Sequence, residues 1–172
     1  MVTEDALIES MRRKAAEGER RAPASLAALH DTERALGFPI DPFLGRTYVE
    51  VSDGGTGPGH GALSLIGAEC LSSTYAAFRS GGWPPGLLPV WDWGDAVWSC
   101  VDASGCVVTM DDTGLATLTD FSSRTWLRAW VDGVDLWAQL FDDKDATIVN
   151  PFTRKPVVTK VRGTAKGRPW RG

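Results

Sequence analysis

The hydrophobic pattern of the first third of the chain predicts three helices. Residues 1–21 are charged throughout and carry few apolar side chains, so we expect a short, loosely attached helix there. A second helix is expected from an N-cap at Ser25 to a C-terminal stop at Gly37. A third should begin after Asp41, which precedes a proline suited to a first helical turn, and end before Gly54.

The central part of the chain has the alternation typical of strands. The glycine-rich run 54–61 is expected to be a loop, the alternating residues 62–67 a strand, and residues 70–79 a helix. Glycine and aspartate breaks then divide residues 87–118 into a meander of short antiparallel strands. These strands are expected at 87–93, 96–102, 106–111 and 115–118.

Residues 122–141 carry apolar side chains at intervals of three and four, which predicts one amphipathic helix lying on the sheet. Gly133 should weaken this helix by roughly 1 kcal/mol relative to alanine. The element order predicts an α+β fold, a twisted antiparallel sheet of about four to six strands packed with helices. We expect a charged N-terminal extension (1–21), a domain (22–150) and a basic tail (151–172).

Composition is ordinary for a globular protein except for eight tryptophans. No apolar stretch is long enough for a spanning helix and the N-terminus is not a secretory signal, so we expect a cytoplasmic protein with no membrane partner. The three cysteines, Cys70, Cys100 and Cys106, have neither zinc-site nor framework spacing and are expected to be reduced. A bond between Cys100 and Cys106 stays open, although hairpin pairing would set them on opposite faces.

The net charge of −4 conceals a division along the chain. Residues 151–172 carry seven basic and no acidic side chains, whereas residues 1–150 carry 22 acidic and 11 basic ones, a net charge of −11. An acidic body would attract a cationic partner by long-range steering. The alternative is that the charge serves solubility and the tail folds back over its own domain.

Acidic residues at the ends of two predicted strands are the one candidate for acid–base chemistry. They are Asp92 with Asp95, and Asp111 with Asp112. A hydrolase using this cluster is one hypothesis. Aspartate is also common in turns because it bonds the local backbone. We therefore expect no catalytic residues, no metal and no cofactor.

Two other sequence features suggest ligands only weakly. The GPGHG segment around His60 lacks the lysine and hydroxyl residues of a phosphate-binding loop and precedes a predicted strand, so we interpret it as a loop beside a binding surface. The basic tail, with Phe152 and Trp170, could contact nucleic acid, but the acidic body would repel it. Nucleic acid and small-molecule substrates are therefore not the partners we expect.

The tryptophans fall into two groups. Trp126, Trp130 and Trp137 have helical spacing and are expected in the core. The others cluster near turns, where full burial is harder and aromatic residues often anchor partners. For this second group, which contains Trp83, Trp91, Trp93 and Trp98, core and interface roles both stay open.

The order of several short segments resembles the SUKH superfamily of Smi/Knr-type regulators and bacterial immunity proteins. Matching segments are Glu33 with Leu36-Gly37 and Pro39, the paired glycines Gly54-Gly55, the run LLPVWDWGDAVWSCVD, and FSSRTWLRAWVDGV. The similarity spans about residues 22–141, with Asp53 where the family usually has asparagine. It implies an α+β fold without catalytic residues that acts by binding protein, in bacteria commonly a toxin and often a nuclease.

These observations lead to a specific expectation. We expect an immunity-type protein that binds a cationic toxin domain through turn and loop residues, including the loop 52–60. The expected binding residues are Trp91, Asp92, Trp93, Asp95, Asp53, His60, Asp111 and Asp112. A regulatory scaffold that binds an endogenous partner is the alternative.

Overall fold

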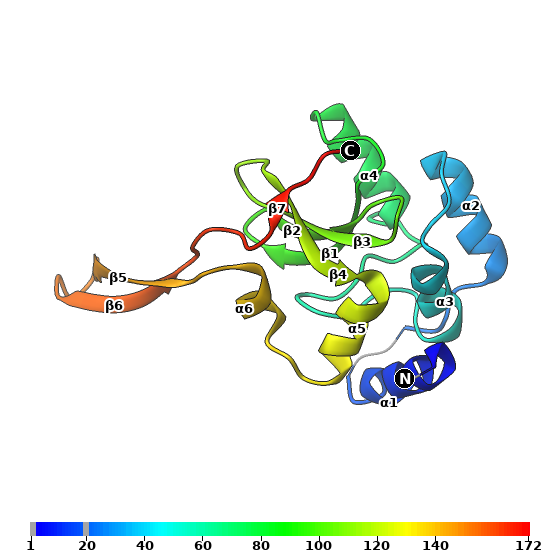
Figure 1. The fold of residues 1–172 in the computed structure, drawn as a ribbon, viewed down its shortest axis with the longest axis horizontal. Coiled ribbons are helices and arrows are strands. Elements are labelled where there is room, and N and C mark those ends of the chain that lie inside the picture. Colours follow the sequence, from blue (N-terminus) through cyan, green and yellow to red (C-terminus); the bar gives the residue numbers. More distant parts are fainter. Residues whose placement is uncertain (1–2, 19–20) are drawn as a thin grey trace.

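A computed structural model describes residues 3–18 and 21–172 of the chain. It has the α+β fold expected from the sequence, with helices packed on a five-stranded antiparallel sheet of order β1-β2-β3-β4-β7 (Figure 1). The strands of this sheet are β1 (Leu88–Gly94), β2 (Val97–Val101), β3 (Cys106–Met110), β4 (Ala116–Ser122) and β7 (Arg168–Pro169). The helices are α1 (Glu4–Ala15), α2 (Leu26–Leu36), α3 (Pro42–Glu50), α4 (Leu71–Ser80), α5 (Ser123–Val131) and α6 (Leu136–Leu140).

Local capping chemistry places the early helices where the sequence predicts them. The side chain of Ser25 accepts a hydrogen bond from the Ala28 amide at the start of α2, and Gly37 ends that helix with φ of 82°. Asp41 accepts from the Leu44 amide at the start of α3. Both boundaries of α2 and the start of α3 are confirmed, whereas α3 ends at Glu50, earlier than the expected end just before Gly54.

The N-terminal helix α1 is part of the core, so the expectation of a loosely attached extension is wrong. Leu7, Ile8 and Met11 are each 1% exposed. Ion pairs also attach α1 to α3, because Arg46 of α3 bonds the carboxylates of Glu4 and Asp5. The large apolar side chains of α1 are few, but these three are buried in the main core, and α1 packs against α3 and α5.

The strand expected at residues 62–67 is also wrong. Only an isolated bridge between Ala62 and Trp91 forms there. The backbone amide of Leu65 donates instead to the side chain of Asp53, at 2.6 Å. A side-chain acceptor therefore replaces the strand partner that the alternating pattern suggested.

The long helix expected over residues 122–141 is two helices, α5 and α6. Gly133 has φ of 75° and its amide donates to Trp130, while the amide of Val134 donates to Ala129. This pair of bonds is the Schellman arrangement that ends a helix at glycine. Asp135 then caps α6 by accepting from the Ala138 amide. Glycine thus ends the helix, where we had expected it only to weaken it.

The four-stranded meander is confirmed, with breaks at the predicted turns. One face of the sheet, with Val97, Val101 and Val107, joins the main core beneath α5. The opposite face carries a second, smaller cluster of Leu87, Cys100, Val108 and Met110. Partly buried tryptophans, Trp83, Trp98 and Trp170, pack against this second cluster.

The C-terminal part of the chain forms a hairpin and then returns to the sheet. β5 (Lys144–Val149) pairs with β6 (Pro156–Val161), so the hairpin crosses residue 150, where the sequence suggested a boundary. Figure 1 shows this hairpin projecting away from the body. Beyond it, β7 pairs with β4 as the fifth strand, and the Trp170 indole donates to Asp102 at 3.2 Å. Only this last part of the tail folds over the domain.

Candidate functional site

The meander brings the candidate acidic residues to one end of the sheet. In an up-and-down sheet alternate turns lie at the same end, so the β1–β2 turn and the β3–β4 turn are neighbours. Asp95 belongs to the first turn and Asp92 lies in β1 two residues before its end, whereas Asp111 and Asp112 belong to the second turn. We call these four residues the acidic end. Asp95 and Asp112 are exposed, and the other two are half-buried.

The glycine-rich loop packs directly against this end of β1. The backbone amide of His60 donates to the carbonyl of Asp92 at 2.8 Å, and its Nδ1 lies 3.9 Å from the Asp92 carboxylate. A Cβ at Gly59 would lie 2.4 Å from the same carbonyl, so this close approach requires glycine. The loop therefore holds an exposed histidine beside the acidic end, as the sequence suggested.

The turn backbone orients these carboxylates. Oδ1 of Asp92 accepts from the amide of Gly94 at 2.8 Å. Oδ1 of Asp111 accepts from the amides of Thr113 and Leu115 at 2.9 and 3.0 Å. These are the local bonds for which aspartate is favoured in turns. These bonds hold the carboxylates of Asp92 and Asp111 in fixed directions, and Arg162 forms an ion pair with the carboxylate of Asp112.

Two of the expected binding residues are structural. Trp91 is 1% exposed, and its ring centroid lies 6.3 Å from that of Trp126 within the core. Asp53 is 7% exposed and its carboxylate accepts the Leu65 amide. Neither side chain is accessible to a partner, so including them in the binding face was wrong.

Trp93 lies between the core and the acidic end. Its indole N–H donates to the Ser99 hydroxyl at 2.8 Å, and its ring centroid is 5.5 Å from that of Trp137. The side chain is half-buried. It can present one edge to a partner while these contacts fix its orientation.

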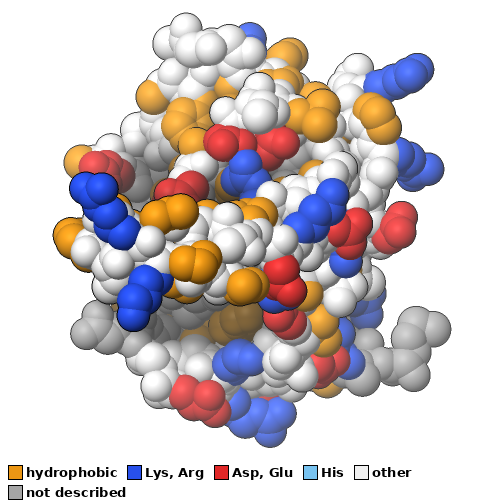
Figure 2. All heavy atoms as spheres, turned by 90° about the vertical axis from the view of Figure 1, so that its left-hand side faces the viewer, with side chains coloured by type: hydrophobic (Ala, Val, Ile, Leu, Met, Phe, Trp, Pro, Cys, Tyr) orange, Lys and Arg blue, Asp and Glu red, His pale blue; other side chains and the backbone are white. Residues whose placement is uncertain are grey.

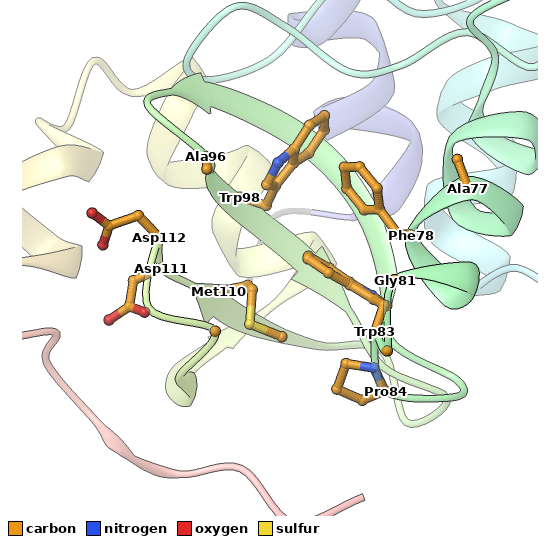
Figure 3. Close-up of a pocket in the computed structure, with 12 residues that line it drawn as sticks. Ala77, Phe78, Gly81, Trp83, Pro84, Ala96, Trp98, Met110, Asp111 and Asp112 are labelled. Carbon is orange, nitrogen blue, oxygen red and sulfur yellow. The ribbon is translucent and has the colours of Figure 1, made fainter.

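Sequence reasoning missed an aromatic groove next to the acidic end. This cavity of about 380 Å³ is lined by Phe78, Trp83, Trp98 and Met110, with Asp111 and Asp112 at its edge. We call it the aromatic groove. Figure 3 shows the three rings grouped on one side and the two carboxylates on the other, pointing away from the rings. The ring centroid of Phe78 lies 4.8 Å from that of Trp83 and 5.3 Å from that of Trp98.

Part of this groove was detectable in the sequence. Trp98 and Met110 are paired across β2 and β3, and a correct hairpin register puts their side chains on the same face. Phe78 and Trp83 come from the end of α4 and the loop after it. Only the packing of α4 against β1 brings them to the sheet, which no local pattern encodes.

The cysteines are free thiols, as expected. Burial raises the pKa of the Cys100 thiol well above its usual range. Within residues 3–18 and 21–172, no three histidine, cysteine or acidic side chains are placed to hold a metal ion. The helices of these same residues include none with the length and apolar character needed to span a membrane.

Comparison with family models, curated proteins and solved structures found no match to this chain.

Proposed function

We propose that this chain is a non-catalytic protein-binding domain, an immunity protein that neutralises a cognate bacterial toxin by direct contact. The observation that carries the proposal is the acidic end, where two turns and the His60 loop present carboxylates beside an aromatic groove. A cluster of charge next to partly exposed aromatic rings is the composition of a protein interface. The order of segments that resembles the SUKH superfamily supports the same class.

The chemistry expected of the partner follows from charge. Residues 1–150 carry a net charge of −11, which would speed association with a cationic protein and disfavour anionic ones. A nuclease toxin is cationic because it must bind phosphates. We therefore propose a basic toxin domain, such as a nuclease, and action in the cytoplasm, where the free thiols would stay reduced.

Binding accounts for the acidic residues better than hydrolysis does. Asp92 and Asp111 each use one oxygen to close their own turn. Catalysis would need paired groups of different proton affinity that converge on one substrate, whereas the carboxylates of Asp111 and Asp112 point away from the rings of the groove (Figure 3). Turn carboxylates of this kind suit recognition of a cationic surface.

The test is protection by this chain against the protein encoded by the adjacent gene. That protein is produced in a host cell with the wild-type chain, with Asp92→Lys/Asp95→Lys, or with the control Glu17→Lys/Asp31→Lys. The control changes the charge equally at two exposed positions away from the acidic end, one in the turn after α1 and one on α2. We expect the wild type and the control to restore growth and to co-purify with the toxin. The double change at the acidic end should do neither.

Two outcomes would contradict the proposal. One is a neighbouring protein that is harmless and does not bind, with a cellular protein captured instead, which would favour a regulatory scaffold. The other is hydrolysis of a substrate by the purified chain that Asp92→Asn or Asp111→Asn removes.

A further inference from the structure

The hairpin of β5 and β6 is an arm with unusual exposure of apolar side chains. We call residues 144–161 the arm. Exposed apolar residues on it are Ile148 at 48%, Val149 at 66%, Phe152 at 93%, Val157 at 43% and Val158 at 67%. The cross-strand pairs place them on both faces, with Ile148 opposite Val157 on one and Thr147 opposite Val158 on the other. A two-stranded hairpin with neither face covered is marginally stable on its own.

The tip of the arm combines an apolar anchor with positive charge. The side chain of Asn150 accepts from the amides of Phe152 and Thr153 at 2.9 and 3.1 Å, which closes the turn. This turn presents the Phe152 ring beside Arg154 and Lys155, all of them exposed. An aromatic ring flanked by cations is typical of an interface anchor.

The arm is fixed at its root and extends away from the body. The amide of Asp142 donates to the carbonyl of Thr164 at 3.1 Å, and Arg162 forms an ion pair with Asp112 at the edge of the aromatic groove. From there the six residues of each strand span roughly 20 Å. Because the root lies at the groove, the tip is carried away from the groove of its own chain (Figure 1).

We propose that the arm of one copy docks on a second copy of this chain, with Phe152 in the aromatic groove and Arg154 and Lys155 beside Asp111 and Asp112. The groove supplies the apolar cover that the tip lacks, with rings on one side and carboxylates on the other (Figure 3). Each copy has one arm and one groove. A reciprocal exchange therefore closes into a two-fold dimer.

Charge favours a second copy over nucleic acid as the occupant. The arm carries Lys144, Arg154, Lys155 and Lys160 against a single acidic residue, Asp145. The first 150 residues of another copy carry −11, which attracts such an arm, whereas the same body would repel a polyanion. The face from which the arm projects shows hydrophobic, basic and acidic side chains close together (Figure 2).

The inference does not rest on the proposed function, because self-association needs no toxin. It does have a consequence for that function. Asp111 and Asp112 belong both to the acidic end and to the groove edge. A cationic partner would therefore compete with the arm for this surface.

The experiment is sedimentation equilibrium of the full chain over a series of concentrations. We expect a dimer of twice 18.6 kDa for the wild type. The arm variant Phe152→Ser/Arg154→Glu/Lys155→Glu should raise the dimer dissociation constant by about tenfold or more, as loss of an aromatic anchor and two charges does at an interface. Because docking would change the surroundings of Trp83 and Trp98, folding of the variant is verified by its far-ultraviolet circular dichroism spectrum, which reports helices and strands and should be unchanged.

A second variant tests the groove. Ala77 is an exposed residue of α4 that lines the groove, so Ala77→Arg should block it and weaken the dimer. Ala76→Arg changes the exposed neighbouring position, which does not line the groove, and should leave the dimer intact. In a mixed dimer of the arm variant and Ala77→Arg, the intact arm of the second protein can dock in the intact groove of the first. The other arm and the other groove are both altered and cannot dock. The mixture should associate more strongly than either variant alone.

Three results would overturn the inference. The first is a wild-type chain that stays monomeric at every concentration. The second is a dimer that the arm variant leaves unchanged. The third is binding of a fluorescent DNA duplex that the arm variant abolishes, which would assign the arm to nucleic acid.

Discussion

Asp53 and Asp95 show how one residue type serves two purposes in this chain. Asp53 is buried, and its carboxylate holds the Leu65 amide at 2.6 Å. Asp95 is exposed in the β1–β2 turn with φ of 49°, a conformation that aspartate and asparagine tolerate. The first should matter for stability and the second for binding.

We expect Asp53→Ala to lower the free energy of unfolding by about 1 to 3 kcal/mol, because it leaves a buried amide without its acceptor. Asp95→Asn keeps the turn and removes only the charge, so it should change stability by less than about 0.5 kcal/mol. Urea denaturation of the two variants measures both values. A larger loss for Asp95→Asn than for Asp53→Ala would contradict the assignment.

Tyr48 gives the protein a pH dependence in alkaline solution. Burial, and then the nearby charge of Asp53, raise the pKa of Tyr48 far above its ordinary value, while its hydroxyl donates to the Leu63 carbonyl at 2.8 Å. In the unfolded chain tyrosine loses its proton at a pH of about 10. The contribution of the neutral hydroxyl is therefore complete below that pH and is lost as the pH rises above it.

We expect Tyr48→Phe to be less stable than the wild type at neutral pH by about 0.5 to 1.5 kcal/mol, because the hydrogen bond is absent. Its stability should then fall less steeply with rising pH. Some slope will remain, because burial also raises the pKa of Cys100. Thermal unfolding followed from neutral to alkaline pH measures both slopes, and equal slopes in the two proteins would refute the role of Tyr48.

At the scale of elements, local chemistry determined which predictions were correct. The caps at Ser25, Gly37 and Asp41, and the turns of the meander, each act within a few residues of sequence. The expected strand at 62–67 failed because its amide bonds a side chain 12 residues away. The aromatic groove could not be predicted as a whole, because it forms only when α4 packs on the sheet.

Replacing Gly133 by alanine distinguishes one continuous helix over residues 122–141 from the two helices of the structure. The two arrangements predict changes in stability of opposite sign. In a continuous helix, replacing this glycine by alanine would stabilise the protein by roughly 1 kcal/mol. In the structure Gly133 has φ of 75° with no neighbouring atom in the way of a Cβ, so only backbone strain matters. Gly133→Ala should therefore destabilise by about 1 to 2 kcal/mol, measured by urea denaturation. A variant more stable than the wild type would instead support one continuous helix over residues 122–141.

At the scale of the whole molecule, the division of charge determines which surfaces can meet. The sequence alone showed the acidic body and basic tail, and it identified the acidic residues that the meander then gathers at one end. Side-chain exposure was harder to predict, since Trp91 and Trp93 are two residues apart and only the second reaches the surface. Both rings lie near that of Trp126, at 6.3 and 6.4 Å between centroids, so contact with this core residue alone does not decide exposure.

The most direct test of the central claim is the dissociation constant between this chain and the basic protein encoded beside it, measured by interferometry at low and moderate salt. We expect Asp92→Lys/Asp95→Lys to weaken binding by about 100-fold, because close interfacial charges are worth more than 1 kcal/mol each. Glu17→Lys/Asp31→Lys should change it much less, and salt should weaken the wild-type complex most. Equal affinity for all three proteins would contradict the claim that the acidic end is the binding face.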